Sequence, residues 1–455
     1  MNETIMQFEL SKEYLERFQQ ALNEQDAEFI RSSLEGVNPA DITALLYEFD
    51  AEECKYVFSL LPKEVDAAIL NDLEDDLRER FISEFSPEEL AQYLEHLDSD
   101  DGADILYQMS IKKREEVIKY IENEEKASNI LDLLRYDEDV AGGLMAKELI
   151  KANINWTILQ CIEEIRKQAE NVQKIYSVYV VDNLGKLVGK VSLKRIILAE
   201  DGVKIADIYD DTVVSVETYM EDEEVAQIMQ KYDLEAVPVV NARGKLVGRI
   251  TIDDVIDVIT EMAEEERQMM AGISSDVEED DTVWMLSKAR LPWLIVGMVG
   301  GLAGAQFIGL FKGDIALIPA LAFFIPLITA TGGNVGIQSS SIVVQSLANP
   351  NVFSDGLLRR LMKVLFVAVV NGVILALMVF GVVMLFNRNE PLAATVSIAL
   401  FSVVLLASFM GTITPLVLDK FGINPALASG PFITTANDLL GLAVYFSVAH
   451  LLYNL

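Results

Sequence analysis

The sequence is poor in cysteine and histidine, with two residues of each among 455. Cys54 and Cys161 are far apart and form no metal-ligand pattern, which is typical of a protein in a reducing compartment. The C-terminal half holds a single histidine, His450, and has no HExxH motif, no GxSxG motif and no paired carboxylates. Because acid–base and nucleophilic catalysis need such groups, we expect no enzymatic activity.

Positive charge is also scarce, with 36 Lys and Arg against 71 Asp and Glu and a net charge of −35. Nucleic-acid phosphates require basic partners, so this imbalance argues against DNA or RNA binding. The acidic excess suits hard divalent cations, which prefer carboxylate oxygens, although a solvated acidic surface would have the same composition. The N-terminus lacks a basic start and an apolar stretch, so we expect no signal peptide.

Charge of either sign is nearly missing from the C-terminal part of the chain. From Trp284 onward there are five acids and eight bases, a net charge of +3, which leaves 66 acids and 28 bases, a net charge of −38, in residues 1–283. An acidic soluble half is therefore expected to precede an apolar half. The length suggests two to four domains.

Five long uncharged or nearly uncharged runs follow Trp284, and each reaches the roughly 20 residues that cross a bilayer core. The runs are Pro292 to Phe311, Ile315 to Ser354, Val364 to Asn387, Pro391 to Leu418 and Phe421 to Leu455. They predict a multi-pass membrane domain of five helices. Lys and Arg are concentrated in the loops on the side of the N-terminal half, which places that half in the cytoplasm of a cell with the C-terminus outside.

Polar groups occur at two places inside these runs. In "IPLITATGGNVGIQSSS", Asn334 and Gln338 lie one helical turn apart, which is consistent with small-residue helix packing or with a polar pore wall, and we favour the pore wall. In the last run, Asp438 is the only charge and shares a face with Thr434. Because an ionised group in lipid costs several kcal/mol, Asp438 is a candidate cation site, with a protonated interhelical donor as the alternative.

Residues 1–136 show helical patterns only. Pro39, Pro62 and Pro87 recur at intervals of 23 and 25 residues, each before a helical pattern, which predicts an all-α superhelical stack. "DSDDGADIL", from Asp98 to Leu106, superficially resembles a calcium-binding loop but lacks its glycine and glutamate spacing. We expect instead a helix start that displays Asp100 and Asp104 one turn apart.

An internal repeat follows in residues 137–256. The motif GKLVG starts at Gly185 and again at Gly244, and each copy reads as strand, turn, strand and helix. This pattern resembles an α/β tandem CBS domain. Such pairs often bind adenine nucleotides through an Asp three residues after a Ser or Thr; Thr251 and Asp254 match, whereas the first copy has Arg195 three residues after Ser192. Nucleotide binding is therefore only weakly supported.

Residues 257–283 are expected to form a connecting helix that leads to the membrane domain at 284–455. Its apolar stripe includes Val258 and Met262, and its other face is acidic. A face of this kind is usually just solvated.

The order of these domains, together with "GGNVGIQSSS" and "INPALASGPFITTANDLLGLAVYF", resembles the MgtE family of magnesium channels over essentially the whole chain. The resemblance implies a homodimer in a lipid bilayer, with its pore on the twofold axis and Asp438 of both subunits facing Mg²⁺, near Thr434 and Asn334. It also implies cytoplasmic Mg²⁺ sensing that holds the connecting helix shut as a plug. The acids that it assigns to sensing are Asp100, Asp104, Glu223, Asp233, Asp254, Asp257, Glu265 and Glu266.

Two positions depart from the family pattern. Met262 stands where an acid is expected on the plug helix, and Asn424 stands where the family commonly has Asp. These differences predict weaker bridges and a different sensing threshold. The competing interpretations are a sodium-coupled divalent cation exchanger and a CBS-regulated membrane receptor or enzyme.

Overall fold

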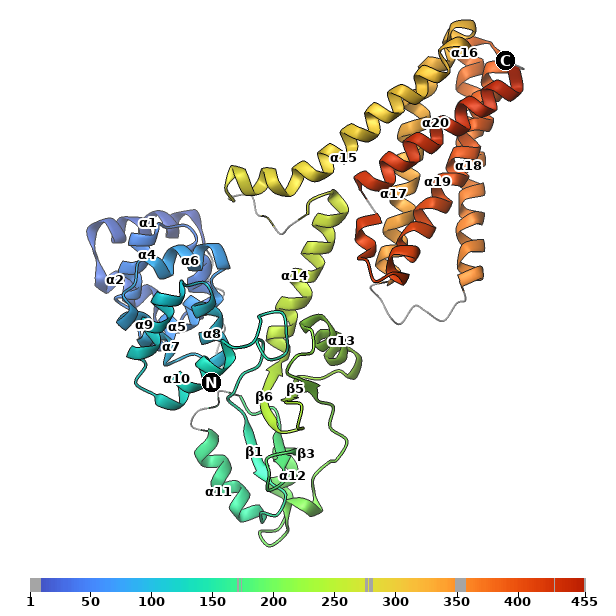
Figure 1. The fold of residues 1–455 in the computed structure, drawn as a ribbon. Coiled ribbons are helices and arrows are strands. Elements are labelled where there is room, and N and C mark those ends of the chain that lie inside the picture. Colours follow the sequence, from blue (N-terminus) through green and yellow to red (C-terminus); the bar gives the residue numbers. More distant parts are fainter. Residues whose placement is uncertain are drawn as a thin grey trace. The chain divides into compact units, whose positions relative to one another are not determined.

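The computed structural model describes residues 10–169, 172, 174–274, 277, 281–347, 357–428 and 430–453. The chain divides into two compact units, Met1–Ile259 and Thr260–Leu455, and each is described by itself (Figure 1).

The first unit begins with a stack of short helices and no strands between residues 10 and 133, as the sequence predicts. Ser86 caps α7 and forms a capping box with Glu89, which fixes where this helix starts. The helices are α1 (Lys12–Glu24), α2 (Ala27–Leu34), α3 (Pro39–Leu46), α4 (Ala51–Phe58), α5 (Lys63–Asp72), α6 (Asp75–Ser83), α7 (Pro87–Leu94), α8 (Ser99–Tyr107), α9 (Ile111–Tyr120) and α10 (Glu124–Leu133).

Aromatic side chains hold this helical stack together. The ring of Phe58 lies 4.8 Å from that of Phe81 and meets the ring of Tyr93 edge-on at 6.0 Å, measured between centroids. Phe58 and Tyr93 are almost completely buried. Burial of aromatic rings in such tilted and edge-on pairs adds to the apolar core that buried leucine and isoleucine side chains also form.

The repeat forms two three-stranded sheets, in the orders β1-β2-β3 and β4-β5-β6. In each sheet the first pair of strands is parallel and the second is an antiparallel hairpin, and Gly185 and Gly244 occupy the hairpin turns with φ of 78° and 73°. The predicted order of strand, turn, strand and helix is confirmed in both copies. The elements are β1 (Ile150–Asn153), α11 (Ile158–Gln168), β2 (Val178–Val181), β3 (Leu187–Val191), α12 (Leu193–Leu198), β4 (Val216–Glu217), α13 (Asp222–Tyr232), β5 (Ala236–Val240) and β6 (Leu246–Thr251).

Helix α14 (Ile252–Ala271) follows β6 without a break. The helix is continuous across residues 256 and 257, where the sequence suggested a domain boundary, so the structure does not test that boundary. In the apolar stripe of this helix, Val255 and Val258 are buried, whereas Ile259 is 41% exposed.

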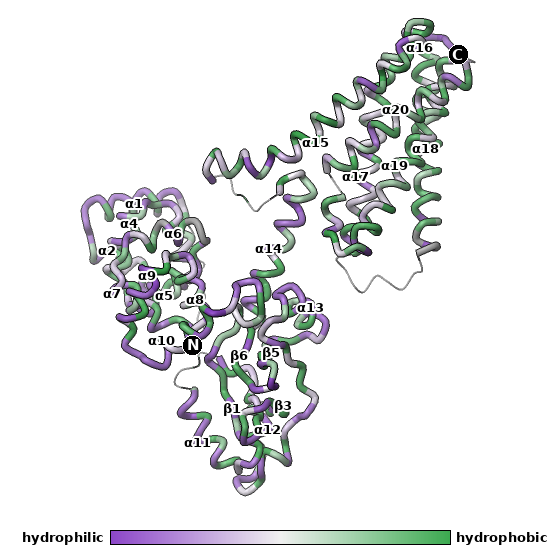
Figure 2. The backbone as a smooth tube through the Cα atoms, viewed as in Figure 1, coloured by the Kyte–Doolittle hydropathy of each residue, from purple (hydrophilic) through white to green (hydrophobic). Residues whose placement is uncertain are grey.

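The long helices of the second unit consist largely of hydrophobic residues, as their colouring in Figure 2 shows. Among the described residues, five helical segments are long and apolar enough to cross a membrane, which confirms the predicted number. The first span starts earlier than expected, with Pro292 inside the helix, and the second is preceded by a short helix and a 3₁₀ turn. The elements are α15 (Val283–Leu310), α16 (Lys312–Leu317), η3 (Pro319–Phe324), α17 (Ile325–Leu347), α18 (Leu357–Asn387), α19 (Glu390–Lys420), η5 (Pro425–Ala428) and α20 (Pro431–Tyr453).

Helix α19 is the centre of this bundle and packs against α17, α18 and α20. Its inner face carries small and medium side chains, including Ala399, Val403 and Ala407, that are at most 2% exposed. Between membrane helices such close packing replaces the hydrophobic effect as the source of association.

A carboxyl group is buried inside the helical stack of the first unit. Asp66 on α5 is 0% exposed, and neither of its oxygens has a hydrogen-bond partner among the described residues. The nearest cation is Lys63, whose Nζ lies 3.7 Å from Oδ2 and which donates a hydrogen bond to Tyr93. Burial raises the pKa of Asp66 to about 8, and Lys63 offsets only part of this effect.

We therefore expect the helical stack to lose stability as the pH rises. The folded-state pKa of Asp66 lies above its unfolded value of 3.8, so the stability linked to the neutral carboxyl is complete below that value and is lost as pH rises through 8. Between pH 6 and pH 9 the loss should reach about 3 kcal/mol. Asp66→Asn should flatten this dependence in thermal melts of the full-length protein. Glu64→Gln, an exposed acid on the same helix, should keep it; equal pH profiles for both variants would refute the assignment.

Candidate functional site

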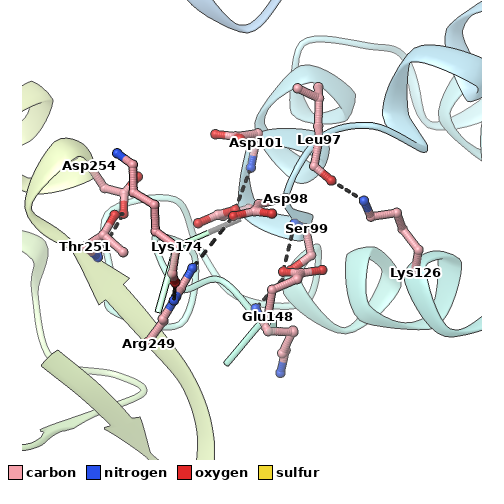
Figure 3. Close-up of polar contacts among 12 residues, drawn as sticks. Leu97, Asp98, Ser99, Asp101, Lys126, Glu148, Lys174, Arg249, Thr251 and Asp254 are labelled. Carbon is pink, nitrogen blue, oxygen red and sulfur yellow. Dashed lines mark hydrogen bonds and ion pairs between the residues drawn. The ribbon is translucent and has the colours of Figure 1, made fainter. Parts of the chain in front are cut away.

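Carboxylates from two separate stretches meet around a cavity of about 250 Å³ in the first unit (Figure 3). One stretch is the start of α8 and the other is the start of α14, with parts of β6 and the segment before β2 completing the wall. The lining residues are Asn71, Asp98, Asp100, Asp101, Ala146, Lys174, Tyr176, Arg249, Thr251, Asp253, Asp254 and Asp257. Six of these twelve residues are aspartates.

Local structure explains how the acids reach the cavity. Asp98 is the N-cap residue of α8, so Asp100 and Asp101 fall in its first turn, where negative charge interacts favourably with the helix dipole. Asp254 lies in the first turn of α14, and its Oδ2 accepts hydrogen bonds from the Thr251 backbone N–H at 3.0 Å and from the Thr251 hydroxyl at 2.7 Å. The carboxylates are thus attached to two helix starts.

The crowded carboxylates raise one another's pKa. Burial is the largest cause at Asp100, and the neighbouring charges of Asp101 and Asp254 raise its pKa further. Burial and the same repulsion raise the pKa of Asp101 to about 7, and burial raises that of Asp254 to about 6 against the hydrogen bonds from Thr251. These carboxylates carry uncompensated repulsion that a cation would relieve.

The cavity has two basic residues of its own. Arg249 of β6 is 4% exposed, whereas Lys174 is exposed. One terminal guanidinium nitrogen of Arg249 donates to the carbonyl oxygen of Lys174 at 2.8 Å, and the other lies 3.8 Å from Oδ2 of Asp98. The guanidinium carbon also lies 5.3 Å from the centre of the Tyr176 ring, within the range of a cation–π contact.

The structure brings some of the predicted sensing acids together and leaves others apart. Asp100, Asp254 and Asp257 line the cavity. Burial, together with the charges of Asp101 and Asp254, raises the pKa of Asp104 to about 7. Glu223 and Asp233 are exposed at opposite ends of α13, about 15 Å apart along its axis, so they do not share a site within one chain.

Glu265 and Glu266 belong to the part of α14 that lies in the second unit, where Glu265 is exposed and burial raises the pKa of Glu266. The sequence prediction did not include Asp98, Asp101 and Asp253, which also line the cavity. The run "DSDD" was a usable signal for the first two, since an acidic N-cap places acids on adjoining positions of the first turn.

The donor set fits a hydrated Mg²⁺ better than a directly coordinated metal. Among the described residues, no three Asp, Glu, His or Cys side chains are grouped closely enough to hold one metal ion. Mg²⁺ loses water reluctantly and is usually held through one or two carboxylates with several waters retained. A cavity wider than a bare-ion site and lined by oxygen donors is compatible with that mode of binding.

The second unit places Asp438 on α20, opposite the glycine-rich part of α17. A side chain at Gly333 would reach within 3.8 Å of Asp438 Oδ1 and within 3.1 Å of Thr434, so the two helices are in close contact here. Thr434 donates its hydroxyl proton to the carbonyl oxygen of Gly430 at 2.9 Å. Asn334, one residue further along α17, is exposed in the single chain.

Glycines also permit the close approach of α17 and α19 next to this position. A β-carbon on Gly411 would lie 2.4 Å from the carbonyl oxygen of Gly336, and one on Gly336 would lie 1.9 Å from the side-chain nitrogen of Asn437. Ser339 and Ser408 complete this contact with a hydroxyl–hydroxyl hydrogen bond of 3.2 Å. The contact between α17 and α19 therefore leaves no room for a side chain at Gly411.

Gly411→Ala tests this contact. Because the obstructing atom is a backbone oxygen, the helices must separate, and we expect a loss of about 3 kcal/mol of stability. The measurement is the melting temperature of the purified protein in detergent. Gly381→Ala on α18 is the matched control, because nothing lies within 4 Å of its β-carbon position. If both variants had the same melting temperature, the structure would be wrong about the close contact between α17 and α19.

Comparison with known families assigns all three parts of the chain. Residues 325–448 match the family profile described as a divalent cation transporter (MgtE), and residues 37–139 match the MgtE intracellular N domain. Residues 139–202 and 205–261 match the CBS domain.

Individual relatives agree with this assignment. The chain is 32% identical to a protein of Thermus thermophilus named Magnesium transporter MgtE, over 95% of this chain and 97% of the relative, and 29% identical to one of the same name from Bacillus subtilis, over 92% and 93%. A solved structure described as the cytosolic domain of the Mg²⁺ channel MgtE in complex with ATP is 34% identical, covers 54% of this chain and 99% of its own, and has a TM-score of 0.51. The chain belongs to the MgtE family.

Proposed function

We propose that this protein carries Mg²⁺ across a cell membrane and that Asp438 forms the ion site in its pore. The observation that supports the proposal is a single carboxylate on α20, in a helix bundle otherwise nearly free of charge, packed against the polar, glycine-rich α17. A charged group at membrane depth usually marks an ion pathway. The names of the relatives point to the same cation.

A homodimer would provide two Asp438 carboxylates for one ion. Two carboxylates neutralise the charge of Mg²⁺ while leaving positions for water, which suits a cation that dehydrates reluctantly. Asn334 is exposed in the single chain, and Thr434 is partly buried beside Gly333. In the dimer these side chains would add neutral oxygens near the ion.

The test is Mg²⁺ uptake into liposomes that contain this protein alone. Uptake that follows the Mg²⁺ gradient and is indifferent to a Na⁺ gradient supports an uncoupled Mg²⁺ pathway. Uptake that requires a Na⁺ gradient would favour the exchanger, and no uptake at all in correctly inserted protein would overturn the proposal.

We further propose that cytoplasmic Mg²⁺ closes this pathway by binding at the acidic cavity. Helix α14 carries Asp254 and Asp257 near its start, and its other end lies at the beginning of α20. There Asn424 donates to the sulfur of Met269 at 3.4 Å, and a β-carbon on Gly430 would lie 2.6 Å from the carbonyl oxygen of Met270. One continuous helix thus has sensing acids at its start and pore-domain contacts at its end.

Ions would then stabilise one conformation through their higher affinity for it. Asp100 and Asp104 belong to the same sensing surface. Glu223, Asp233, Glu265 and Glu266 do not gather around the cavity, so in this proposal they bind ions together with other parts of the dimer.

An adenine nucleotide is a second candidate ligand of the CBS pair. The structural relative binds ATP, and the pattern of Thr251 and Asp254 is present here beside Tyr176. In this chain, however, Thr251 and Asp254 are hydrogen-bonded to each other, and Arg195 replaces the corresponding acid of the first copy. Titration of the full-length protein with ATP tests this directly.

Asp438→Asn should reduce Mg²⁺ uptake at least tenfold, because it removes the charge and keeps the shape and hydrogen bonding of the side chain. Its melting temperature should stay within about 2 °C of the parent, since no stabilising ion pair is lost. Asp419→Asn at the exposed end of α19 is the matched control and should transport normally. Wild-type uptake by a well-folded Asp438→Asn protein would contradict the assignment.

Asp254→Asn combined with Asp257→Asn should keep the pathway open at Mg²⁺ concentrations that close the parent. Asparagine retains an acceptor for Thr251, so the start of α14 should remain capped while two charges disappear. The measurement is patch-clamp current against cytoplasmic Mg²⁺. Two exposed acids on α9 supply the control, Glu115→Gln with Glu116→Gln, which should close like the parent. Normal closure of the Asp254/Asp257 variant would remove the cavity from the mechanism.

A further inference from the structure

We infer that Arg249 is a resident cation of the acidic cavity, which competes with the regulatory divalent ion and thereby sets the Mg²⁺ concentration at which the cytoplasmic domains respond. The inference rests on the proposed sensing function and adds a residue that determines its threshold.

The position of Arg249 is fixed by its own strand and by its neighbours. Its backbone exchanges two hydrogen bonds with Ala146, at 2.9 and 2.8 Å, so β6 holds the residue on the cavity wall. The guanidinium donates a hydrogen bond to the carbonyl oxygen of Lys174 (Figure 3). It also contacts the ring of Tyr176. These contacts are independent of the carboxylates, and they keep the charge in place when an ion arrives.

The pairing of Arg249 with the acids is incomplete. Its contact with Asp98 is 3.8 Å long, beyond the 2.7–2.9 Å typical of a charge-assisted hydrogen bond. Its Nε is buried and has no hydrogen-bond partner among the described residues. A cation that is almost fully buried is therefore placed beside the carboxylates without satisfying any one of them, which leaves their oxygens available to a second cation.

The charge of the lining explains the expected effect. Six aspartates face two basic side chains, Arg249 and the exposed Lys174. Like charges a few ångströms apart interact by kilocalories even at the high effective dielectric of a protein surface, so a divalent ion entering the cavity is repelled by Arg249. Without that charge the same carboxylates should bind Mg²⁺ more tightly.

The experiment measures hydrogen–deuterium exchange of α8 and of the start of α14 in the full-length protein, across a Mg²⁺ titration at constant ionic strength. Arg249→Met, which keeps most of the side-chain volume, should lower the half-protecting Mg²⁺ concentration about tenfold. Arg249→Lys, which keeps the charge, should stay within about twofold of the parent. Arg243→Met in the exposed turn between β5 and β6 removes the same charge from the surface and should also stay within twofold.

An unchanged or raised half-protecting concentration in Arg249→Met would overturn the inference and leave the sensing proposal intact. Equal shifts in Arg249→Met and Arg249→Lys would also overturn it, because they would indicate lost packing. If the parent itself showed no Mg²⁺-specific protection, both the sensing proposal and this inference would fall. Should Arg249→Met not fold, Arg249→Gln, which retains a donor for the Lys174 carbonyl oxygen, gives the same decision.

Discussion

Repulsion among carboxylates that share one small cavity is the constraint on which the first unit depends. Asp98 and Asp101 approach from the helical stack, and Asp253 and Asp254 approach from the end of the CBS pair, so the two parts contact each other through groups of the same charge. Burial makes this repulsion stronger, because carboxylates removed from water are less well screened. This repulsion opposes the direct contacts between the two parts, such as the hydrogen bond of 2.7 Å that the Ser99 hydroxyl donates to Glu148 and the ion pair of 2.6 Å between Lys147 and Asp132.

The same repulsion becomes relevant to the membrane domain because of where α14 begins. Helix α14 carries Asp254 in its first turn and is about 30 Å long for its 20 residues. At the other end, the close contacts of Met269 and Met270 with Asn424 and Gly430 leave little room for independent movement. In the proposed mechanism, this helix would connect the acidic cavity to those contacts.

Much of the fold could be predicted from the sequence, because its signals are local and repeated. Prolines and capping residues marked the helix starts, the repeated GKLVG marked two hairpins, and uncharged runs marked the membrane helices. The site was less predictable. Asp438 could be found as a lone charge in an apolar run, but the cavity joins residues that are about 150 positions apart. Arg249 reads as an ordinary strand residue, since nothing in the local pattern tells that its side chain faces inward.

Burial also limited what the sequence could say about single groups. Asp66 looks like any other acid in an acidic helix, and only the packing of α5 shows that both of its oxygens are buried without a hydrogen-bond partner among the described residues. Similarly, the sequence shows Gly411 only as one more small residue in a membrane helix. The structure shows that a backbone oxygen of α17 occupies the position that a β-carbon at Gly411 would need.

The hydrogen bonds at the start of α14 limit how many oxygens Asp254 can offer to a cation in the cavity. Both the backbone N–H and the hydroxyl of Thr251 bind the same oxygen of Asp254, Oδ2, which leaves Oδ1 as the oxygen open to a cation. A carboxylate engaged in this way is a monodentate ligand. Calcium sites commonly use a bidentate carboxylate within a shell of six to eight oxygens, whereas Mg²⁺ accepts single oxygens and fills its octahedron with water. In the proposed ion site, the residue that caps the helix would thereby favour Mg²⁺ over Ca²⁺.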